Sequence, residues 1–311
     1  MFEIETRNLV KKFGSFTAVN GLDLQVRKGE IFGFLGPNGA GKTTTIKMLT
    51  TLAAPTSGTA IIAGYDVAKE PAKVRSRIGV VPQSFSLFEE LSPMENLWYI
   101  GKLNEIPEKE IREKSIELLK AVTLYDKRDL PSGGFSGGMK QRLSLAASLL
   151  HEPDILFMDE PTTGLDPQSR IAMREITRDL NNKGVTVIYT THDMDEAEKL
   201  CDRIAIMDHG NIIATGTADE LKRKVSKYEI AEIGAPDVSK ETVEALSKLS
   251  FVHSVEKDGP QLVCEVSDGN EMFSKLSEFF KKRKQPVSEI RIRKLTLEDV
   301  FIKLTKKDLR E

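Results

Sequence analysis

A glycine-rich run between a predicted strand and a predicted helix is the feature that most constrains the fold of this sequence. Glu30–Leu35 is an apolar run typical of a buried strand, and residues 42 to about 52 follow a helical pattern. The residues between them are Gly-Pro-Asn-Gly-Ala-Gly, followed by Lys-Thr. Glycines allow successive backbone N–H groups to point inward at a phosphate, and the helix N-terminus adds its positive end. The run therefore predicts a phosphate-binding loop.

This loop predicts a nucleoside triphosphate with Mg²⁺ as its ligand. Lys42 would contact the β- and γ-phosphates, and the Thr43 hydroxyl would bind the metal. A glycine-rich surface turn is the alternative, and the flanking strand and helix argue against it. The residues that we expect around the phosphates are Gly36, Pro37, Asn38, Gly39, Ala40, Gly41, Lys42, Thr43 and Thr44.

The composition is that of an ordinary globular protein. The 311 residues are 40% hydrophobic and 30% charged, with a formal net charge of -2, which disfavours a protein that coats nucleic acid. Cys201 and Cys264 lie far apart and cannot form a disulfide framework or a zinc site alone. No window is long and apolar enough to cross a membrane, and a signal-peptide pattern is absent. We expect a cytoplasmic protein that reaches a membrane only through a partner.

The pattern of hydrophobic residues changes several times along the chain. Residues up to about 28 alternate as in antiparallel strands, and residues 91–150 follow helical periodicity, which predicts a helical subdomain. Ile155–Met158 and Val185–Tyr189 are short apolar runs typical of parallel sheets. We therefore expect an α/β domain over residues 1–222.

Residues 223–311 predict a second, smaller domain. Their elements follow the order β-α-β-β-α-β, which is typical of a ferredoxin-like α+β sandwich. Thr296, with Asp299 three residues later, can cap one further helix. The basic run Lys281–Lys284 favours a solvated helix end over a site for lipid or nucleic acid.

Two adjacent carboxylates, Asp159 and Glu160, end the apolar run that begins at Ile155. At the carboxyl end of a parallel strand they would face the phosphate-binding loop across the sheet. Asp159 would then hold Mg²⁺, and Glu160 would polarise the attacking water. An acidic strand end without a catalytic role is the alternative. Together with the loop, the pair predicts hydrolysis of the terminal phosphate.

Further motifs follow one another along the chain: Phe13, Gln83, the run Phe-Ser-Gly-Gly-Met at Phe135–Met139, Gly-Leu-Asp at Gly164–Asp166, and His192. In this order they resemble the nucleotide-binding subunit of ATP-binding-cassette (ABC) transporters over about residues 3 to 220. They match the aromatic that stacks on adenine, the Q-loop, the signature, the D-loop and the switch histidine. The resemblance implies a P-loop ABC cassette with an antiparallel β subdomain and a helical subdomain.

The resemblance implies that two subunits pack head to tail and trap two ATP molecules. Ser136, Gly137 and Gly138 would bind the γ-phosphate held by the opposing subunit. His192 would donate a hydrogen bond to the γ-phosphate, and Gln83 would contact the metal and the water. The D-loop Asp166 is a further nucleotide-site residue. In this family ATP closes the subunit pair, and hydrolysis reopens it.

Three of these assignments have alternatives, and for Gln83 the alternative is a simple loop glutamine. Ser132–Gly134 repeats the Ser-Gly-Gly of the signature, and we favour Ser136 because a predicted helix follows it directly. The signature itself has Phe135 for the usual leucine and Met139 for the usual glutamine. Phe13 could be a core phenylalanine instead of a stacking one.

The segment from Ser84 to Trp98 is rich in large apolar side chains. By the resemblance it lies beside the groove in which a coupling helix of the membrane subunit docks, although these residues could equally belong to the subdomain core. The apolar residues are Phe85, Leu87, Phe88, Leu91 and Trp98.

Three segments resemble the daunorubicin-resistance type of ABC ATPase: Ile31–Leu35, Asn38–Thr45 and Leu295–Thr305. This type implies export through a separate membrane permease at the cytoplasmic face of the cell membrane, and we expect the additional domain to stabilise a homodimer. The alternatives are an import ATPase and a soluble ATPase outside transport. The short span from Lys42 to Ser136 disfavours a chromosome-type ATPase, the single cassette disfavours a translation-type ATPase, and the two predicted helices after Lys240 disfavour the barrel of an import type.

Overall fold

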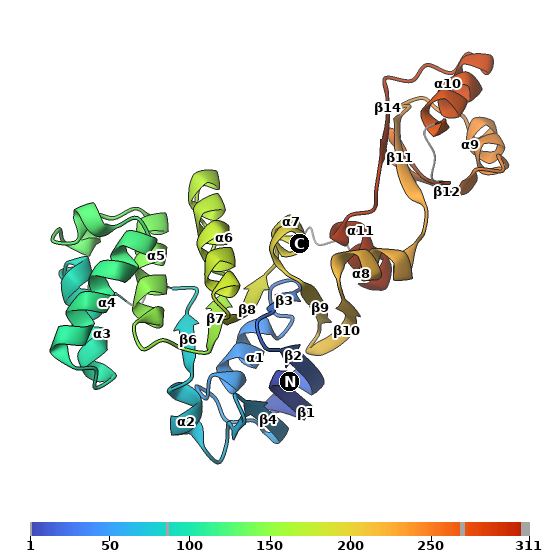
Figure 1. Cartoon of the computed structure of the whole chain (residues 1–311). Coiled ribbons are helices and arrows are strands. Elements are labelled where there is room, and N and C mark those ends of the chain that lie inside the picture. The colour runs from blue at the N-terminus through green and yellow to red at the C-terminus, as the bar shows by residue number, and fades with distance from the viewer. Residues whose placement is uncertain (1, 85–86, 268–270, 306–311) are drawn as a thin grey trace. The chain divides into compact units, whose positions relative to one another are not determined.

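The computed structural model describes residues 2–84, 87–267 and 271–305, so that Phe85 lies outside the described residues. The chain divides into two compact units, Met1–Ala218 and Asp219–Glu311 (Figure 1). The division falls in α8 (Ala218–Val225), close to the boundary at residue 222 that the sequence suggested.

A six-stranded sheet forms the centre of the first unit, with the order β10-β9-β3-β8-β7-β6. All neighbouring strands are parallel except β10, which is antiparallel to β9. The strands are β3 (Ile31–Leu35), β6 (Ile78–Val81), β7 (Ile155–Asp159), β8 (Thr186–Thr191), β9 (Arg203–Asp208) and β10 (Asn211–Gly216). β3, β7 and β8 are buried along their whole length, which explains their continuous apolar pattern.

Alternate residues of these strands enter two different cores. In β7, Phe157 packs with α1 (Lys42–Leu49), while Leu156 and Met158 pack against α5 (Gly137–Leu149) and α6 (Pro167–Asn182). α7 (Met194–Leu200) also contributes to the second core through Leu200. The predicted parallel sheet is confirmed, and helices cover both of its faces.

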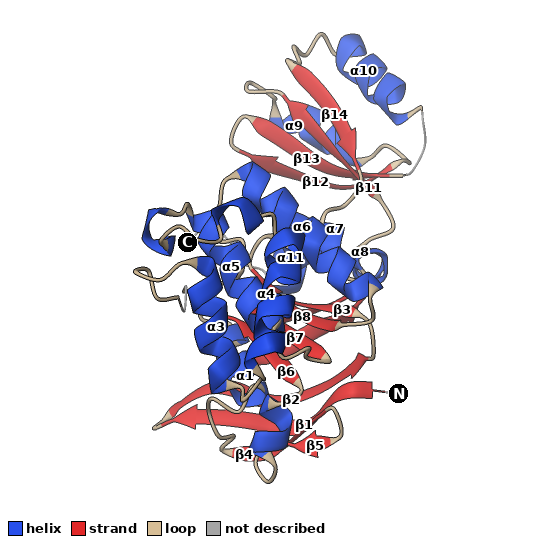
Figure 2. Ribbon diagram, turned by 60° about the vertical axis from the view of Figure 1, so that its left-hand side comes forward, coloured by secondary structure: helices blue, strands red, loops and turns tan. Residues whose placement is uncertain are grey.

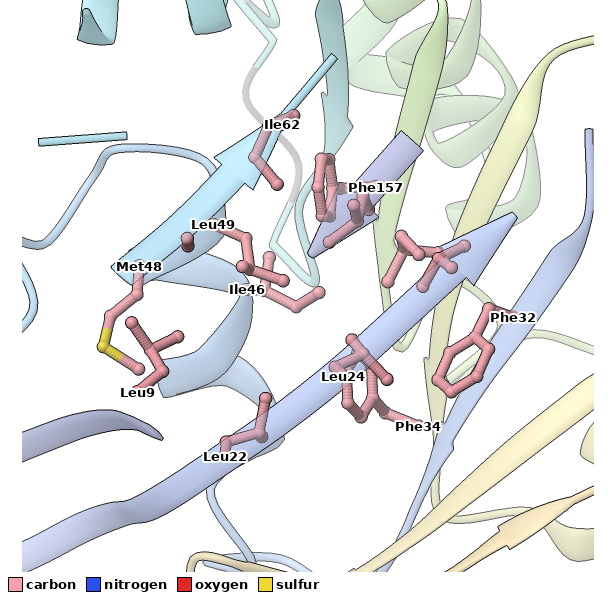
Figure 3. Packing of buried hydrophobic residues seen from close by; sticks show 14 of the residues in the cluster. Leu9, Leu22, Leu24, Phe32, Phe34, Ile46, Met48, Leu49, Ile62 and Phe157 are labelled. Atoms are coloured by element: carbon pink, nitrogen blue, oxygen red, sulfur yellow. The ribbon is translucent and has the colours of Figure 1, made fainter. Parts of the chain in front are cut away.

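A second, antiparallel sheet covers the core around α1. It has the order β2-β1-β4-β5, with strands β1 (Phe2–Phe13), β2 (Phe16–Arg27), β4 (Ser57–Ile62) and β5 (Tyr65–Asp66). Figure 3 shows Leu9, Leu22 and Leu24 of this sheet packed with Phe32 and Phe34 of β3 and with α1. The short helix α2 (Pro71–Arg75) leads on to β6. The predicted antiparallel β subdomain is confirmed.

The helical subdomain contains α3 (Pro93–Leu103), α4 (Glu108–Ala121) and α5, with short 3₁₀ turns at Tyr125–Lys127 and Ser132–Gly134. Ser92 and Glu95 form a capping box at the start of α3. The buried Asn96 accepts a hydrogen bond from Phe88 N and donates to Phe88 O, Leu91 O and Ser132 Oγ. This side chain therefore fixes the segment before α3 to the segment before α5.

The second unit is a ferredoxin-like sandwich, as predicted. Its sheet has the order β12-β13-β11-β14, and all neighbouring strands are antiparallel (Figure 2). The elements are β11 (Glu229–Gly234), α9 (Lys240–Ser247), β12 (Val252–Asp258), β13 (Gln261–Val266), α10 (Met272–Lys282), β14 (Glu289–Arg293) and α11 (Leu297–Thr305). Side chains of α9 and α10 pack with the sheet in one core.

The last helix begins at the cap that the sequence predicted. Thr296 Oγ1 accepts a hydrogen bond from Asp299 N, and Asp299 Oδ2 accepts one from Thr296 N at 2.7 Å. Arg293 of β14 donates to both carboxylate oxygens of Asp299 and to Glu232 of β11. These charges connect α11 to the sheet.

Candidate active site

The phosphate-binding loop joins β3 to α1 and lines a pocket of about 220 Å³. The lining residues are Phe16, Ala18, Pro37, Asn38, Gly39, Ala40, Gly41, Lys42, Thr43, Thr44, Gln83 and Glu160. Gly36 lies behind this surface, and a Cβ there would be 2.3 Å from the Met207 carbonyl oxygen. Gly41 has a φ of 103° and packs against Ala18, so both positions require glycine.

Lys42 is buried at the floor of the loop. Its Nζ donates hydrogen bonds to Gly36 O at 2.7 Å and Pro37 O at 3.1 Å, and it forms an ion pair with Glu160 Oε1 at 3.1 Å. The ammonium group thus touches both the loop and the carboxylate at the end of β7. A phosphate in the pocket would meet this charge directly.

Asp159 and Thr43 come together from different elements, as the sequence predicted that they should. Asp159 Oδ1 accepts hydrogen bonds from Thr190 Oγ1 at 2.6 Å and from Thr43 Oγ1 at 3.3 Å. A carboxylate and a hydroxyl are the oxygen ligands that Mg²⁺ prefers. No cluster of three His, Cys, Asp or Glu side chains suited to a metal occurs among the described residues, so a cation here would need further oxygens from a ligand.

Glu160 occupies a strained position directly after β7. Its φ of 46° lies in the left-handed region, and its N–H donates to Thr190 Oγ1 at 2.9 Å. The carboxylate accepts hydrogen bonds from Thr163 Oγ1 at 3.2 Å and from His192 Nδ1 at 3.1 Å. The side chain is therefore fixed between Lys42 and His192 and points into the pocket.

The charges around Glu160 keep it ionised. Burial raises the pKa of this carboxyl, but Lys42, His192 and Thr163 together lower it by more, so that the net pKa lies below its usual value. An ionised carboxylate only accepts hydrogen bonds, and His192 Nδ1 is therefore the donor in that contact. His192 follows β8, and 46% of its side chain is exposed.

The signature residues lie outside the pocket. Ser136 caps α5 by accepting a hydrogen bond from Met139 N at 3.3 Å, and both Ser136 and Gly137 are exposed. Gly138 is buried against Ser169, where a Cβ would lie 2.2 Å from the Ser169 hydroxyl oxygen. By contrast, the Ser132 hydroxyl is buried and donates to Leu91 O at 2.7 Å.

The two unusual residues of the signature pack into the helical subdomain. Phe135 and Met139 lie against the core formed by α3, α4 and α5. The serine and both glycines of the signature remain.

The remaining predicted residues lie at the margin of the site. Gln83 is exposed and lines the pocket. Asp166 is exposed, caps α6 by accepting from Ser169 N at 3.0 Å, and does not line the pocket. Phe13 is 56% exposed beside Lys11, whose Nζ lies 5.1 Å from the ring centroid.

Sequence reasoning missed Phe16. This residue lines the pocket, is 63% exposed and pairs with Phe13 across the hairpin between β1 and β2. The sequence did contain a signal for this residue, because Phe16 is an aromatic residue three positions after Phe13, at the start of the next strand-like run.

The fold and these contacts define a P-loop ATPase, with a phosphate loop, a strand-end carboxylate pair and a histidine on one edge of a parallel sheet. Residues 19–163 match the model of the family described as "ABC transporter", and residues 216–305 match the model of the C-terminal domain of DrrA1-3-like ATP-binding proteins. The chain belongs to the ATP-binding subunits of ABC transporters, and its second domain is of the DrrA type.

Relatives match over nearly the whole chain. The linearmycin resistance ATP-binding protein LnrL of Bacillus subtilis is 37% identical over 99% of this chain and 100% of its own length. The daunorubicin/doxorubicin resistance ATP-binding protein DrrA of Streptomyces peucetius is 42% identical over 97% of this chain and 92% of its own. The Nod factor export ATP-binding protein I of Ralstonia nicotianae is 38% identical over 99% of this chain and 95% of its own length. The chain is thus an ATPase of the export type.

Solved structures agree with the first unit. An ATP-binding cassette of an ABC transporter in its ADP conformation has a TM-score of 0.66 and 30% identity, covering 72% of this chain and 94% of that one. A dimeric post-hydrolysis cassette bound to ADP and Pi has a TM-score of 0.63 and 28% identity, and the match covers 69% of this chain and 98% of that one. In the described part of the chain, no helix is long and apolar enough to cross a bilayer.

Proposed function

We propose that two copies of this ATPase close head to tail on two Mg-ATP molecules and drive export through a separate membrane permease. The observation that carries the proposal is that the catalytic groups and the signature do not meet within one copy. Lys42, Glu160 and His192 are in contact at the pocket, whereas Ser136 and Asp166 are exposed outside it. One copy therefore holds half of a site, and a second copy can supply the other half.

In the proposed reaction, Glu160 orients the water that attacks the γ-phosphate. Before nucleotide binds, it is ionised and buried, and Lys42 and His192 hold it at the pocket. Lys42 compensates the negative charge of the phosphates. When both of its ring nitrogens carry a proton, His192 can donate to Glu160 and to the γ-phosphate, where negative charge develops. The loop amides and the N-terminus of α1 bind the remaining phosphate oxygens.

Thr43 and Asp159 fit Mg²⁺, since their oxygens lie 3.3 Å apart at the edge of the phosphate loop. Gln83, exposed on the same pocket, is available for the metal and the water. When bound, the ion neutralises charge on the β- and γ-phosphates. The aromatic pair of Phe13 and Phe16 offers exposed ring faces for adenine.

Ser136 is the better candidate for the contact across the pair. It stands exposed at the N-terminus of α5, where backbone N–H groups and the helix dipole favour an anion. The rival Ser132 uses its buried hydroxyl for Leu91 and Asn96. The solved dimer of a similar cassette with ADP and Pi supports the two-subunit arrangement.

A pocket of about 710 Å³ between α3 and α4 supports docking of a permease helix. Its apolar lining comprises Met94, Trp98, Ile111 and Ile116, and 46% of the Trp98 side chain is exposed. An apolar pocket beside exposed aromatic residues is a typical site for an amphipathic helix. Leu87 instead packs into the subdomain core, so only part of the apolar segment before α3 is free for docking.

Export is favoured over import by the second domain and by the relatives. The ferredoxin-like sandwich differs from the barrel expected of an import type. Relatives of nearly equal length are named for drug resistance and for Nod factor export. We place the protein at the cytoplasmic face of the membrane, held there by the permease. No nucleic-acid partner is expected.

The test is to tag the protein, solubilise native membranes in mild detergent and identify copurifying proteins by mass spectrometry. We expect a polytopic membrane protein in stoichiometric amount, lost in Trp98→Glu and retained in the control Leu52→Glu, which changes an exposed leucine outside the pocket. Recovery of the wild-type protein from the soluble fraction alone would contradict the transport proposal.

A further inference from the structure

Two segments of the active site are joined by polar contacts that the proposed chemistry does not use. The D-loop segment, residues 161–166, directly follows Glu160. The switch segment, residues 191–196, carries His192. Glu196, the last residue of the switch segment, and Arg170 of α6 join the two segments.

Glu196 forms the first connection, from inside the protein. Its side chain is 4% exposed, and its Oε2 accepts hydrogen bonds from Thr162 Oγ1 at 2.6 Å and from Thr191 Oγ1 at 3.3 Å. No lysine, arginine or histidine forms an ion pair with it within the described ranges. A buried carboxylate without a cation depends on its hydroxyl donors, so both threonines are held closely to it.

Tyr189 is a neighbour of this carboxylate. Burial is the main cause that raises the pKa of the Tyr189 hydroxyl well above its usual value, and the charge of Glu196 is the second cause. Tyr189 lies in β8, just before the switch segment, and is fully buried. The carboxylate, 4% exposed, is thus largely removed from solvent beside β8.

Arg170 forms the second connection, from α6. Its Nε donates to Leu165 O in the D-loop segment at 3.2 Å, and its Nη1 contacts Asp193 Oδ2 in the switch segment at 3.2 Å. Asp193 in turn caps α7 by accepting from Glu196 N at 3.0 Å. The planar guanidinium can donate in both directions at once, which a lysine cannot do in the same geometry.

We propose that Glu196 and Arg170 are positioning residues that lock the D-loop segment to the switch segment. Glu160 is continuous with the first segment and His192 belongs to the second, and the two side chains are 3.1 Å apart. Displacement of either segment therefore separates the pair. The lock makes the placement of the catalytic pair depend on the position of Asp166, where the proposed second copy would make contact. The inference rests on the roles proposed above for Glu160 and His192.

The test compares Thr162→Val, which removes the hydroxyl while keeping the volume, with Thr162→Ser, which keeps the hydroxyl. In the full chain we expect Thr162→Val to lower kcat for ATP hydrolysis by roughly tenfold or more, because small misplacement of catalytic groups costs this much. KM for ATP should change by less than about twofold, since the phosphate loop is untouched. Thr162→Ser should keep most of kcat, and Arg170→Lys should resemble Thr162→Val.

Thermal unfolding and ATP titration of each variant show whether a fall of kcat comes from misplaced catalytic groups or from loss of structure. Equal kcat for Thr162→Val and the wild type would overturn the inference. So would an equal fall of kcat in Thr162→Val and Thr162→Ser, or a fall that is matched by lost ATP binding. Glu160→Gln is measured in parallel: if it still hydrolyses ATP substantially, the catalytic role proposed for Glu160 fails, and this inference loses its basis.

Discussion

Lys42 and Glu160 form an ion pair with 3.1 Å between Nζ and Oε1, and only 4% and 7% of their side chains is exposed. Lys42 Nζ also donates hydrogen bonds to the carbonyl oxygens of Gly36 and Pro37. A triphosphate in the pocket would compete for the same ammonium group. We therefore expect nucleotide binding to draw Lys42 from Glu160 and to leave the carboxylate available for water.

Replacing Glu160 by Gln should separate binding from hydrolysis. The amide keeps the volume but cannot accept a proton, so turnover should fall by roughly a hundredfold or more, while ATP affinity stays within a few-fold of the wild type. The measurements are steady-state hydrolysis and nucleotide titration. Glu175→Gln, at an exposed position on α6, is the matched control and should leave both unchanged. Substantial turnover in Glu160→Gln would remove this residue from the mechanism.

Replacing Lys42 by Met should weaken ATP binding itself. Loss of a charge-assisted contact with phosphate predicts a Kd that is roughly ten- to a hundredfold higher. The control is Lys47→Met, which changes an exposed lysine of the same helix. If the two variants bind ATP equally well in isothermal titration calorimetry, Lys42 is not a phosphate ligand.

The same variant should change the titration of Glu160. Burial raises the pKa of this carboxyl and Lys42 is the strongest of the groups that lower it, so its removal should raise the pKa. In the wild type the lowered pKa stabilises the fold at pH values above the pKa that Glu160 has in the unfolded chain. This stabilisation is lost as the pH falls through the lower pKa of the folded protein. Lys42→Met should lack this contribution. Thermal unfolding between neutral and acidic pH tests the point, and identical pH dependence of the two proteins would contradict it.

Asn96→Ala should destabilise the helical subdomain. The substitution leaves the backbone groups of Phe88 and Leu91 without their side-chain partner, at a cost of about 2–4 kcal/mol. Asn104→Ala removes one hydrogen bond from the exposed asparagine at the C-cap of the same helix and should cost less than about 1 kcal/mol. Denaturant unfolding compares the two, and equal losses would show that Asn96 has no special role.

Asp299 should make the second unit sensitive to acid. Burial raises the pKa of its carboxyl, but hydrogen bonds from Arg293 and Thr296 lower it by more. The resulting stabilisation is present above the unfolded pKa of about 3.9 and is lost as pH falls through the lower folded pKa. We expect the amides of α11 to lose hydrogen-exchange protection in this range. Asp299→Asn should show weaker protection already at neutral pH, and unchanged protection in this variant would contradict the prediction.

Local patterns in the sequence predicted most of the fold. The run before the phosphate loop predicted β3, the pairing of Thr296 with Asp299 predicted the start of α11, and the order of elements predicted the ferredoxin-like sandwich. The first two depend on residues close together in the chain, where hydrophobic periodicity and helix capping act directly. The third depends only on the order of elements that were each recognised locally.

Contacts between distant segments could not be predicted in this way. Asn96 joins Ser132, and Glu196 joins Thr162, across 36 and 34 residues. Such contacts depend on how helices and strands pack, which local pattern does not encode. Phe16 was missed for the same reason, since its place at the pocket follows from strand pairing and from the path of the loop.

The most direct test of the central claim is light scattering of Glu160→Gln with Mg-ATP, with ADP and without nucleotide. We predict a dimer with Mg-ATP and a monomer in the other two conditions. A second substitution, Ser136→Arg, should abolish the dimer while ATP binding to the phosphate loop persists. A monomer in all conditions, or a dimer that forms equally well with Ser136→Arg, would contradict the proposal that two copies complete each other's ATP site through the signature.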